Sequence, residues 1–170
     1  DKNGLQFVAT DAHRLVRYKR KDVSGPRSDN FIVPRKPLNL LKAAIPANED
    51  ELTLSYNNNH LFVKHGTTQM SCRLIDARFP DYKVVIPADN PYRLTVGKSD
   101  FQSALRRVSI FSNKSTNQVA LSISGSELQL AAQDVDFSFE GNERMKCQYN
   151  GEDLVIAFNS KFLIEMLSAA

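Results

Sequence analysis

The sequence lacks tryptophan, has only two cysteines and three histidines among its 170 residues, and contains no long hydrophobic run. A helix that spans a membrane needs about 20 consecutive apolar residues, and a signal peptide needs a basic stretch before an apolar core. Neither pattern occurs. Cys72 and Cys147 are too far apart for a zinc or redox motif, which favours two buried thiols in a reducing compartment. We therefore expect a cytoplasmic protein without a metal or another cofactor.

Charge of neither sign dominates the chain. Lys and Arg number 22, Asp and Glu number 19, and 42% of the residues are hydrophobic. This balance is typical of a folded chain and argues against intrinsic disorder. The net charge of +3 permits contact with nucleic acid but does not demonstrate it, so the positions of the basic residues matter more than their total.

Most of the chain alternates apolar and polar residues, as half-buried β-strands do. The segments are short and are separated by turn residues such as Gly66, Gly97 and Gly125. This pattern predicts antiparallel sheets. The expected strands lie at 5–10, 15–20, 52–56, 61–65, 93–96, 119–124, 128–132 and 154–158.

Three segments have helical periodicity instead. Residues 35–45 contain Pro37 near the first turn, where a missing N–H costs little. A second helix is expected at 98–112, opened by a capping box of Ser99 and Gln102, and a third begins at Asn159 as its N-cap. The positions expected to face the core are Leu38, Leu41 and Ile45 in the first helix, Phe101, Leu105, Val108 and Ser112 in the second, and Phe162 or Leu163 with Met166 and Leu167 in the third.

The chain also contains an internal repeat. The segment LQFVATD at 5–11 aligns with LQLAAQD at 128–134, and residues 33–44 align with 158–169 in the same order and at nearly the same offset. The two matches imply a duplicated module of about 124 residues. A chain of 170 residues would then hold the end of one module and the start of the next, and we expect it to be a fragment of a longer protein.

Four motifs, ATDAHRL at 9–15, FIVPRK at 31–36, RFPDY at 78–82 and IAFNSKFL at 156–163, occur in an order and at spacings that span nearly all of the chain. Together they resemble the beta sliding clamp family, the processivity factor of bacterial DNA polymerase III. The resemblance implies an α+β fold of repeated clamp modules, with antiparallel sheets and helices on one side. It also implies two parts here: residues 1–82, from the second of three modules, and residues 83–170, from the third.

The resemblance explains why the expected helices are basic on one side. A clamp holds duplex DNA without reading its sequence, so it needs a positive field toward the phosphates and weak contacts. The implied DNA-facing residues are Arg35, Lys36, Lys42, Arg106 and Arg107. A merely solvated helix face is the alternative interpretation of each of them.

The resemblance also implies a groove that binds short extended peptides of DNA polymerase III subunits, the clamp loader and other clamp-binding proteins. This sequence departs from the common family pattern at Ala12, where Gly is frequent, at Val84, where a basic residue is common, and at Phe162, where Tyr is frequent. The positions that match the family groove are Thr10, Ala12, His13, Arg14, Leu15, Pro80, Val84, Val85, Asn159 and Phe162.

Ile110 and Phe111 follow the main buried stripe of the second helix, and either core packing or a ring interface would account for them. By resemblance they are interface residues of a full-length homodimer that closes a ring around double-stranded DNA. Two other readings remain open: a nucleic-acid-binding domain that grips DNA without encircling it, and a small enzyme that uses Asp11 and His13. No nucleophile or metal-ligand set accompanies that pair, so we expect no enzyme.

Overall fold

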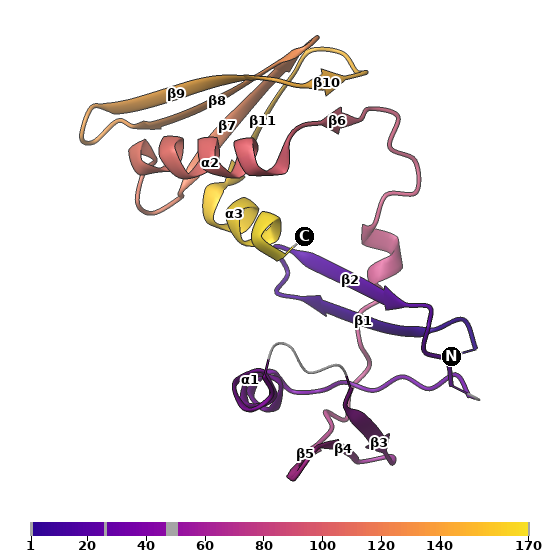
Figure 1. Ribbon diagram of the computed structural model, residues 1–170. Coiled ribbons are helices and arrows are strands. Elements are labelled where there is room, and N and C mark those ends of the chain that lie inside the picture. The colour runs from indigo at the N-terminus through magenta and orange to yellow at the C-terminus, as the bar shows by residue number, and fades with distance from the viewer. Residues whose placement is uncertain (1, 26, 47–50, 170) are drawn as a thin grey trace. The chain divides into compact units, whose positions relative to one another are not determined.

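The computed structural model describes residues 2–25, 27–46 and 51–169 (Figure 1). The chain divides into two compact units, Asp1–Ile86 and Pro87–Ala170. Each unit has its own cluster of buried side chains.

The first unit contains two antiparallel sheets. One is a hairpin of β1 (Leu5–Thr10) and β2 (Leu15–Arg20), in which Thr10 pairs with Leu15 next to the turn. The other sheet has the order β3-β4-β5, and a short 3-10 helix, η1, follows it. The remaining elements are α1 (Arg35–Ala44), β3 (Thr53–Tyr56), β4 (His60–His65), β5 (Thr68–Arg73) and η1 (Tyr82–Val85).

The core of the first unit is small. Leu61, Val63 and Cys72 are buried, and Leu41 of α1 packs against them. Leu38 is 47% exposed, so its expected burial is wrong. It lies about 60° around the helix from Leu41 at ~100° per residue, and the three-stranded sheet covers only the face that carries Leu41.

The second unit is built on a four-stranded antiparallel sheet with the order β11-β7-β8-β9. The helices lie on one side of this sheet (Figure 1). A short pair, β10-β6, accompanies it. The elements are β6 (Leu94–Thr95), α2 (Lys98–Val108), η2 (Ser109–Phe111), β7 (Gln118–Ser124), β8 (Glu127–Asp134), β9 (Phe139–Lys146), β10 (Gln148–Tyr149), β11 (Leu154–Asn159) and α3 (Ser160–Ala169).

The core of this unit forms where α2 covers β7 and β8. All four positions of the expected stripe are buried: Phe101, Leu105, Val108 and Ser112. They face a sheet surface of Val119, Leu121, Ile123, Leu128, Leu130 and Ala132. Leu163, Ile164 and Leu167 of α3 pack against the same cluster. Met166 is 51% exposed, so its expected burial is wrong, because α3 turns Ile164 toward the core instead.

The two expected helix starts had different outcomes. Asn159 caps α3 as predicted, because its side-chain Oδ1 accepts hydrogen bonds from the backbone N–H groups of Lys161 (3.0 Å) and Phe162 (3.4 Å). The predicted capping box of α2 is wrong. Gly97 is the N-cap, and the Gln102 amide instead donates to the Ile164 carbonyl and to Ser168 Oγ on α3. The Gln102 side chain therefore joins two helices rather than closing one.

The expected strands are all present, and the sequence reading missed β5, β9 and β10. β5 (TQMSCR) and β9 (FEGNERMK) are too polar to show an apolar alternation. The two copies of the internal repeat fold alike: LQFVAT forms β1, LQLAAQD lies in β8, and each is the first strand of an antiparallel hairpin. Within the described residues, no helix is long and apolar enough to cross a membrane. Ala170, at the end of the third expected helix, lies outside those residues.

Candidate functional site

The turn between β1 and β2 is held by side chains. Asp11 Oδ1 accepts hydrogen bonds from the backbone N–H groups of His13 (3.1 Å) and Arg14 (2.8 Å), and the Arg14 guanidinium donates to Asp11 Oδ2 at 2.8 Å. Thr10 Oγ1 donates to the Arg14 carbonyl (2.7 Å) and accepts from the Ala12 N–H (3.2 Å). Hydrogen bonds among the residues of the motif TDAHR therefore fix the shape of this turn.

Asp11 serves this turn as an anion. Hydrogen bonds from the Arg14 side chain, and then from backbone N–H groups, lower the pKa of Asp11 from 3.8 to about 2. A carboxylate with so low a pKa is a poor general base near neutral pH. In the described part of the chain, no group of three His, Cys, Asp or Glu side chains is arranged to hold a metal ion. The turn thus gives no support to an acid–base centre of Asp11 and His13.

Ala12 adopts a left-handed backbone conformation, with φ of 71°. A Cβ is strained in this region, and glycine is not. This strain explains why Gly is frequent at this position in the family that the sequence resembles. Ala12 keeps the turn but stores strain in it.

Residues 79–85 form a second ordered segment of the first unit. The Tyr82 N–H donates to the Pro80 carbonyl (2.8 Å), and the Tyr82 hydroxyl accepts a hydrogen bond from the Gln6 amide on β1. This bond ties η1 to the hairpin. Val84 and Val85 nevertheless remain 77% and 65% exposed. Two adjacent valines are thus exposed to solvent on a segment that is anchored to the hairpin.

Asn159 and Phe162 belong to the second unit, at the junction of β11 and α3. Besides capping α3, Asn159 donates from its amide to the Thr116 carbonyl (3.0 Å), which ties the helix start to the loop before β7. Phe162 lies in the first turn of α3 and is half-buried. The structure therefore groups the expected peptide-binding residues by unit. The first unit carries Thr10, Ala12, His13, Arg14 and Leu15 in and beside one turn, and Pro80, Val84 and Val85 in a segment bonded to the same hairpin. The second unit carries Asn159 and Phe162.

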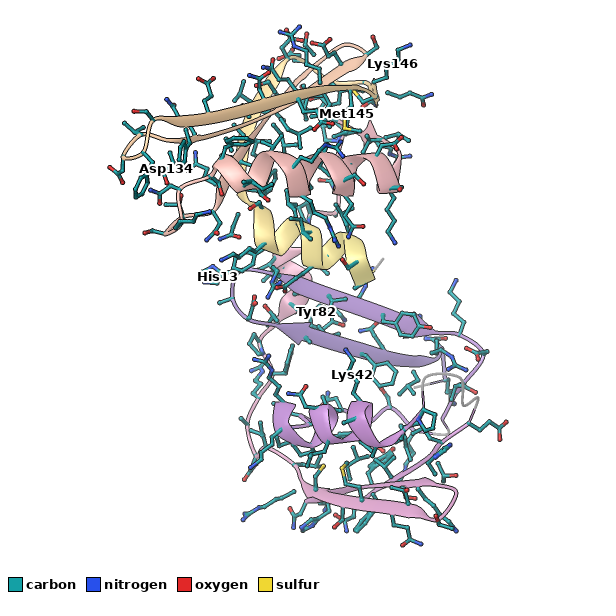
Figure 2. The ribbon with its side chains drawn as sticks, turned by 60° about the vertical axis from the view of Figure 1, so that its left-hand side comes forward. His13, Lys42, Tyr82, Asp134, Met145 and Lys146 are labelled. Atoms are coloured by element: carbon teal, nitrogen blue, oxygen red, sulfur yellow. The ribbon has the colours of Figure 1, made fainter. Side chains whose placement is uncertain are left out.

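The basic residues of α1 are all exposed. Arg35 and Lys42 are seven residues apart and so lie on one face of the helix, with Lys36 beside Arg35. Figure 2 shows Lys42 on the side of α1 that is remote from the β3-β4-β5 sheet. These charges thus lie about 100° to 140° around the helix from Leu41, which packs on the core.

The two arginines of α2 have different surroundings. The Arg107 guanidinium donates to both carboxylate oxygens of Glu143 on β9, with Nε 3.0 Å from Oε2. This pairing raises the pKa of Arg107 and lowers that of Glu143. Arg106 is exposed, and no ion pair to it occurs among the described residues. Arg106 and Arg107 were expected to act alike, but they differ in the structure: the carboxylate of Glu143 neutralises the charge of Arg107 only.

Ile110 and Phe111 lie in η2, directly after α2. Ile110 is 65% exposed and Phe111 is 38% exposed. The Phe111 ring occupies the space above Gly141 of β9, where a Cβ would overlap it. Core packing alone does not account for Ile110, whose side chain is mostly in solvent.

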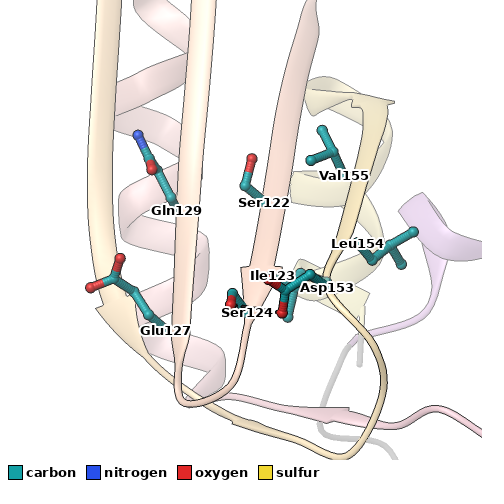
Figure 3. A pocket seen from close by; sticks show the side chains of 8 residues that line it. All are labelled: Ser122, Ile123, Ser124, Glu127, Gln129, Asp153, Leu154 and Val155. Carbon is teal, nitrogen blue, oxygen red and sulfur yellow. Dashed lines mark hydrogen bonds between the residues drawn. The ribbon is translucent and has the colours of Figure 1, made fainter.

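An open depression lies over β7, β8 and β11 (Figure 3). Its charged lining residues are Glu127 and Asp153, and Ser124 Oγ donates to Asp153 Oδ1 at 2.7 Å. The acidic lining does not suit a phosphate, and we assign this depression no function.

Two family models match the chain one after the other. Residues 1–81 match the central domain of the DNA polymerase III beta subunit, and residues 83–170 match its C-terminal domain. The chain belongs to the DNA polymerase III beta subunit family. The resemblance drawn from the four motifs is therefore confirmed.

Curated relatives carry the name beta sliding clamp. The chain is 32% identical to that of Haemophilus influenzae over 168 residues and 30% identical to that of Salmonella typhimurium over 165 residues. These matches cover 98% and 97% of the chain but only 45% of each relative. The chain thus spans about half the length of the curated relatives it matches.

Solved structures agree with this assignment. The DNA polymerase III subunit beta of Pseudomonas aeruginosa superimposes with a TM-score of 0.92 at 27% identity, over 99% of this chain and 46% of that one. The subunit of Borrelia burgdorferi, solved in complex with a natural product, has a TM-score of 0.92 at 28% identity and covers 99% and 45%. The expected α+β clamp fold is confirmed.

Three further residues support the expected site residues, although none of them was expected from the sequence. A hydrogen bond between Gln6 and Tyr82 positions the segment at 79–85, and Glu143 neutralises the charge of Arg107.

Proposed function

We propose that this chain is part of a DNA sliding clamp, a non-enzymatic ring that encircles duplex DNA and tethers the replicative polymerase. The single observation that carries the proposal is the succession of central and C-terminal family models along the whole chain. We assign residues 1–82 to the second clamp module and residues 83–170 to the third. A replication clamp works where the bacterial chromosome is copied, so the proposal also assigns the protein to the cytoplasm.

The first part of the proposed function is peptide binding. We assign it to the ten residues that match the family groove, eight on the first unit and Asn159 and Phe162 on the second. The turn at 10–14 is held by its own hydrogen bonds, and this supports the role, because a preformed surface loses little conformational entropy when a peptide binds. Partners would be DNA polymerase III subunits, the clamp loader and other clamp-binding proteins.

Val84 and Val85 supply apolar area for this surface. Burying a whole valine side chain contributes about 1.5 to 3 kcal/mol. Since 77% of Val84 and 65% of Val85 are exposed, most of that gain remains available to a bound peptide. The exposed pair therefore suits the leucine and phenylalanine anchors of a short extended peptide.

The second part is sequence-independent DNA binding. Arg35, Lys36, Lys42 and Arg106 are exposed on helices, and we assign them to the face that meets DNA phosphates. Long, solvated cations give diffuse attraction that breaks easily, which a sliding ring requires. Arg107 belongs to the same set by position, but Glu143 compensates its charge.

The third part is ring closure by the full-length protein as a homodimer. We assign Ile110 and Phe111 to the boundary between subunits. Their exposure at the end of α2 supports this role, because a solvent-exposed isoleucine beside an aromatic ring is typical of the apolar centre of an interface.

The experiment compares two exposed valines in the full-length protein. A short fluorescent peptide rich in Leu and Phe is titrated against Val84→Asp and Val155→Asp, and binding is followed by fluorescence anisotropy. Val155 lies on β11, is 72% exposed and is not among the assigned groove residues, so it is the matched control. Val84→Asp should weaken binding about tenfold or more, because a carboxylate must then be desolvated against the peptide. Equal affinity of Val84→Asp and the parent protein would contradict the groove assignment.

The ring is tested on circular and linear DNA. A clamp loaded by its loader should stay on a closed plasmid and be lost when the plasmid is cut, since only topology retains it. Tight binding of the unloaded protein to linear DNA, with a steep salt dependence, would show a domain that grips DNA instead.

A further inference from the structure

The hairpin of β1 and β2 carries different side chains on its two faces. Residues that pair directly across an antiparallel hairpin point to the same side of it. Phe7 and Tyr18 share one face, where their ring centroids lie 6.4 Å apart. The other face carries the pairs Thr10–Leu15, Val8–Arg17 and Gln6–Lys19. The face with two of the assigned groove residues therefore also carries two cations.

The 3-10 helix η1 lies on this same face. The Gln6 amide donates to the Tyr82 hydroxyl, and Gln6 is directly opposite Lys19 in the hairpin. Val84 and Val85 follow Tyr82 in η1 and are mostly exposed. The two cations of β2 therefore border the surface on which η1 offers its apolar side chains.

The charges of Arg17 and Lys19 are not compensated within the described part of the chain. Both side chains are exposed, and neither forms an ion pair with another described residue. The neighbouring Arg20 points to the opposite face and donates from Nε to Asp22 Oδ1 at 2.9 Å. The carboxylate of the hairpin turn is bound within the turn itself. Two positive charges on the groove side of the hairpin thus remain available to a ligand.

The spacing of these cations suits an extended peptide. Arg17 and Lys19 are two and four residues from Leu15 along β2, which is about 7 Å and about 14 Å at the rise of a strand. An extended peptide has the same rise, so acidic side chains within about four positions of an anchor at Leu15 come within reach of one cation or the other.

We propose that Arg17 and Lys19 form a basic border of the peptide groove and select partner peptides that carry Asp or Glu beside their Leu and Phe anchors. The inference rests on the proposed function, which assigns the groove. It adds two residues outside the ten that match the family groove, and it gives the peptide a charge. Charge complementarity of this kind favours one partner over another more than it adds affinity.

An acidic peptide suits this surface better than DNA does. The cations lie beside Leu15 and the exposed valines of η1, and a phosphate backbone offers no apolar group to bury against them. A peptide with apolar anchors and neighbouring carboxylates uses both kinds of group at once.

The test uses two fluorescent peptides with the same Leu and Phe anchors, one with two Asp residues beside the anchors and one with Asn in their place. Binding to the full-length protein is followed by fluorescence anisotropy at low salt. Arg17→Gln with Lys19→Gln should weaken binding of the Asp peptide about fivefold and leave the Asn peptide unchanged, since exposed ion pairs contribute modestly. Added salt should reduce this difference.

The matched control is Arg144→Gln with Lys146→Gln. These residues are also an exposed arginine and lysine two positions apart on a strand, but they lie on β9 and are not assigned to the groove. The control should bind both peptides as the parent does. An equal loss of the Asp peptide in this control would show that only the net charge of the protein matters, and the inference would be overturned.

Val84→Asp separates the inference from the proposed function. If it weakens both peptides while the Arg17 and Lys19 variant weakens neither, the groove stands and the basic border is refuted. If it weakens neither, the groove assignment fails and the inference fails with it. If the Arg17 and Lys19 variant lowers affinity for a labelled DNA duplex as much as for the Asp peptide, the two cations attract phosphates in general, and selection of acidic peptides is refuted.

Discussion

Glu143 should limit how strongly α2 attracts DNA. Its carboxylate holds the guanidinium of Arg107, while Arg106, one residue earlier, has no such partner among the described residues. Replacing Glu143 by the isosteric Gln removes the negative charge and keeps the side-chain size. We expect Glu143→Gln to release Arg107 for contact with phosphates and to strengthen DNA binding.

The magnitude follows from counterion release. Each phosphate that a protein cation neutralises contributes about 0.9 to the slope of log K against log salt concentration. Glu143→Gln should therefore steepen the slope by about 0.9, and Arg106→Ala should make it shallower by about 0.9. Arg107→Ala in the parent protein should leave the slope nearly unchanged, because that charge is already compensated.

The assay is fluorescence anisotropy of a labelled duplex with the full-length protein, at salt concentrations low enough for weak binding to be measured. The double variant Glu143→Gln with Arg107→Ala is the internal control and should return to the parent slope. If Arg107→Ala lowers the slope as much as Arg106→Ala does, and Glu143→Gln changes nothing, the ion pair does not shield Arg107 and the reasoning is refuted.

Two further predictions concern the turn of the first hairpin. Ala12→Gly should raise the free energy of unfolding by about 0.5 to 1 kcal/mol in urea titrations, because it relieves the left-handed strain at φ 71°. Ala9→Gly, at an extended position of β1, should lower it by a similar amount, and a stabilising effect there would contradict the argument. Asp11 has a lowered pKa, so its contribution is complete above the ordinary value of 3.8 and is lost as the pH falls toward about 2. Asp11→Asn should therefore flatten the loss of stability in this pH range, and an unchanged acid denaturation curve would count against the Arg14 pairing.

Much of this fold could be predicted because residues that face the core recur in the sequence with the period of their helix or strand. Phe101, Leu105 and Val108 recur at helical spacing, and all are buried. The strands β5 and β9 escaped prediction because they hold few apolar residues, although their backbones pair with β4 and β8 along their whole lengths. Gln102 shows a second reason why a prediction from sequence fails. A glutamine at this position can complete a capping box or bond to another helix, and the position of α3 determines which contact forms.

The binding role of the candidate site stays a prediction. The resemblance selected its residues through short local motifs, such as ATDAHRL at 9–15 and RFPDY at 78–82, but contacts between distant residues leave no such local signal. The compensation of Arg107 was not predictable, since Glu143 is 36 residues away in sequence and meets it only through the packing of α2 beside β9. The same holds for Gln6 and Tyr82, which are 76 residues apart.

The two cysteines make the stability of each unit separately observable. Cys72 belongs to the small cluster of the first unit, and Cys147 belongs to the larger cluster of the second. Both thiols are free and less than a tenth exposed, so a thiol reagent reaches each one only when its own core opens. Burial also raises the pKa of Cys147, which slows its reaction further. Peptide mass spectrometry after timed labelling would thus read the opening of both units in one sample, with no engineered probe.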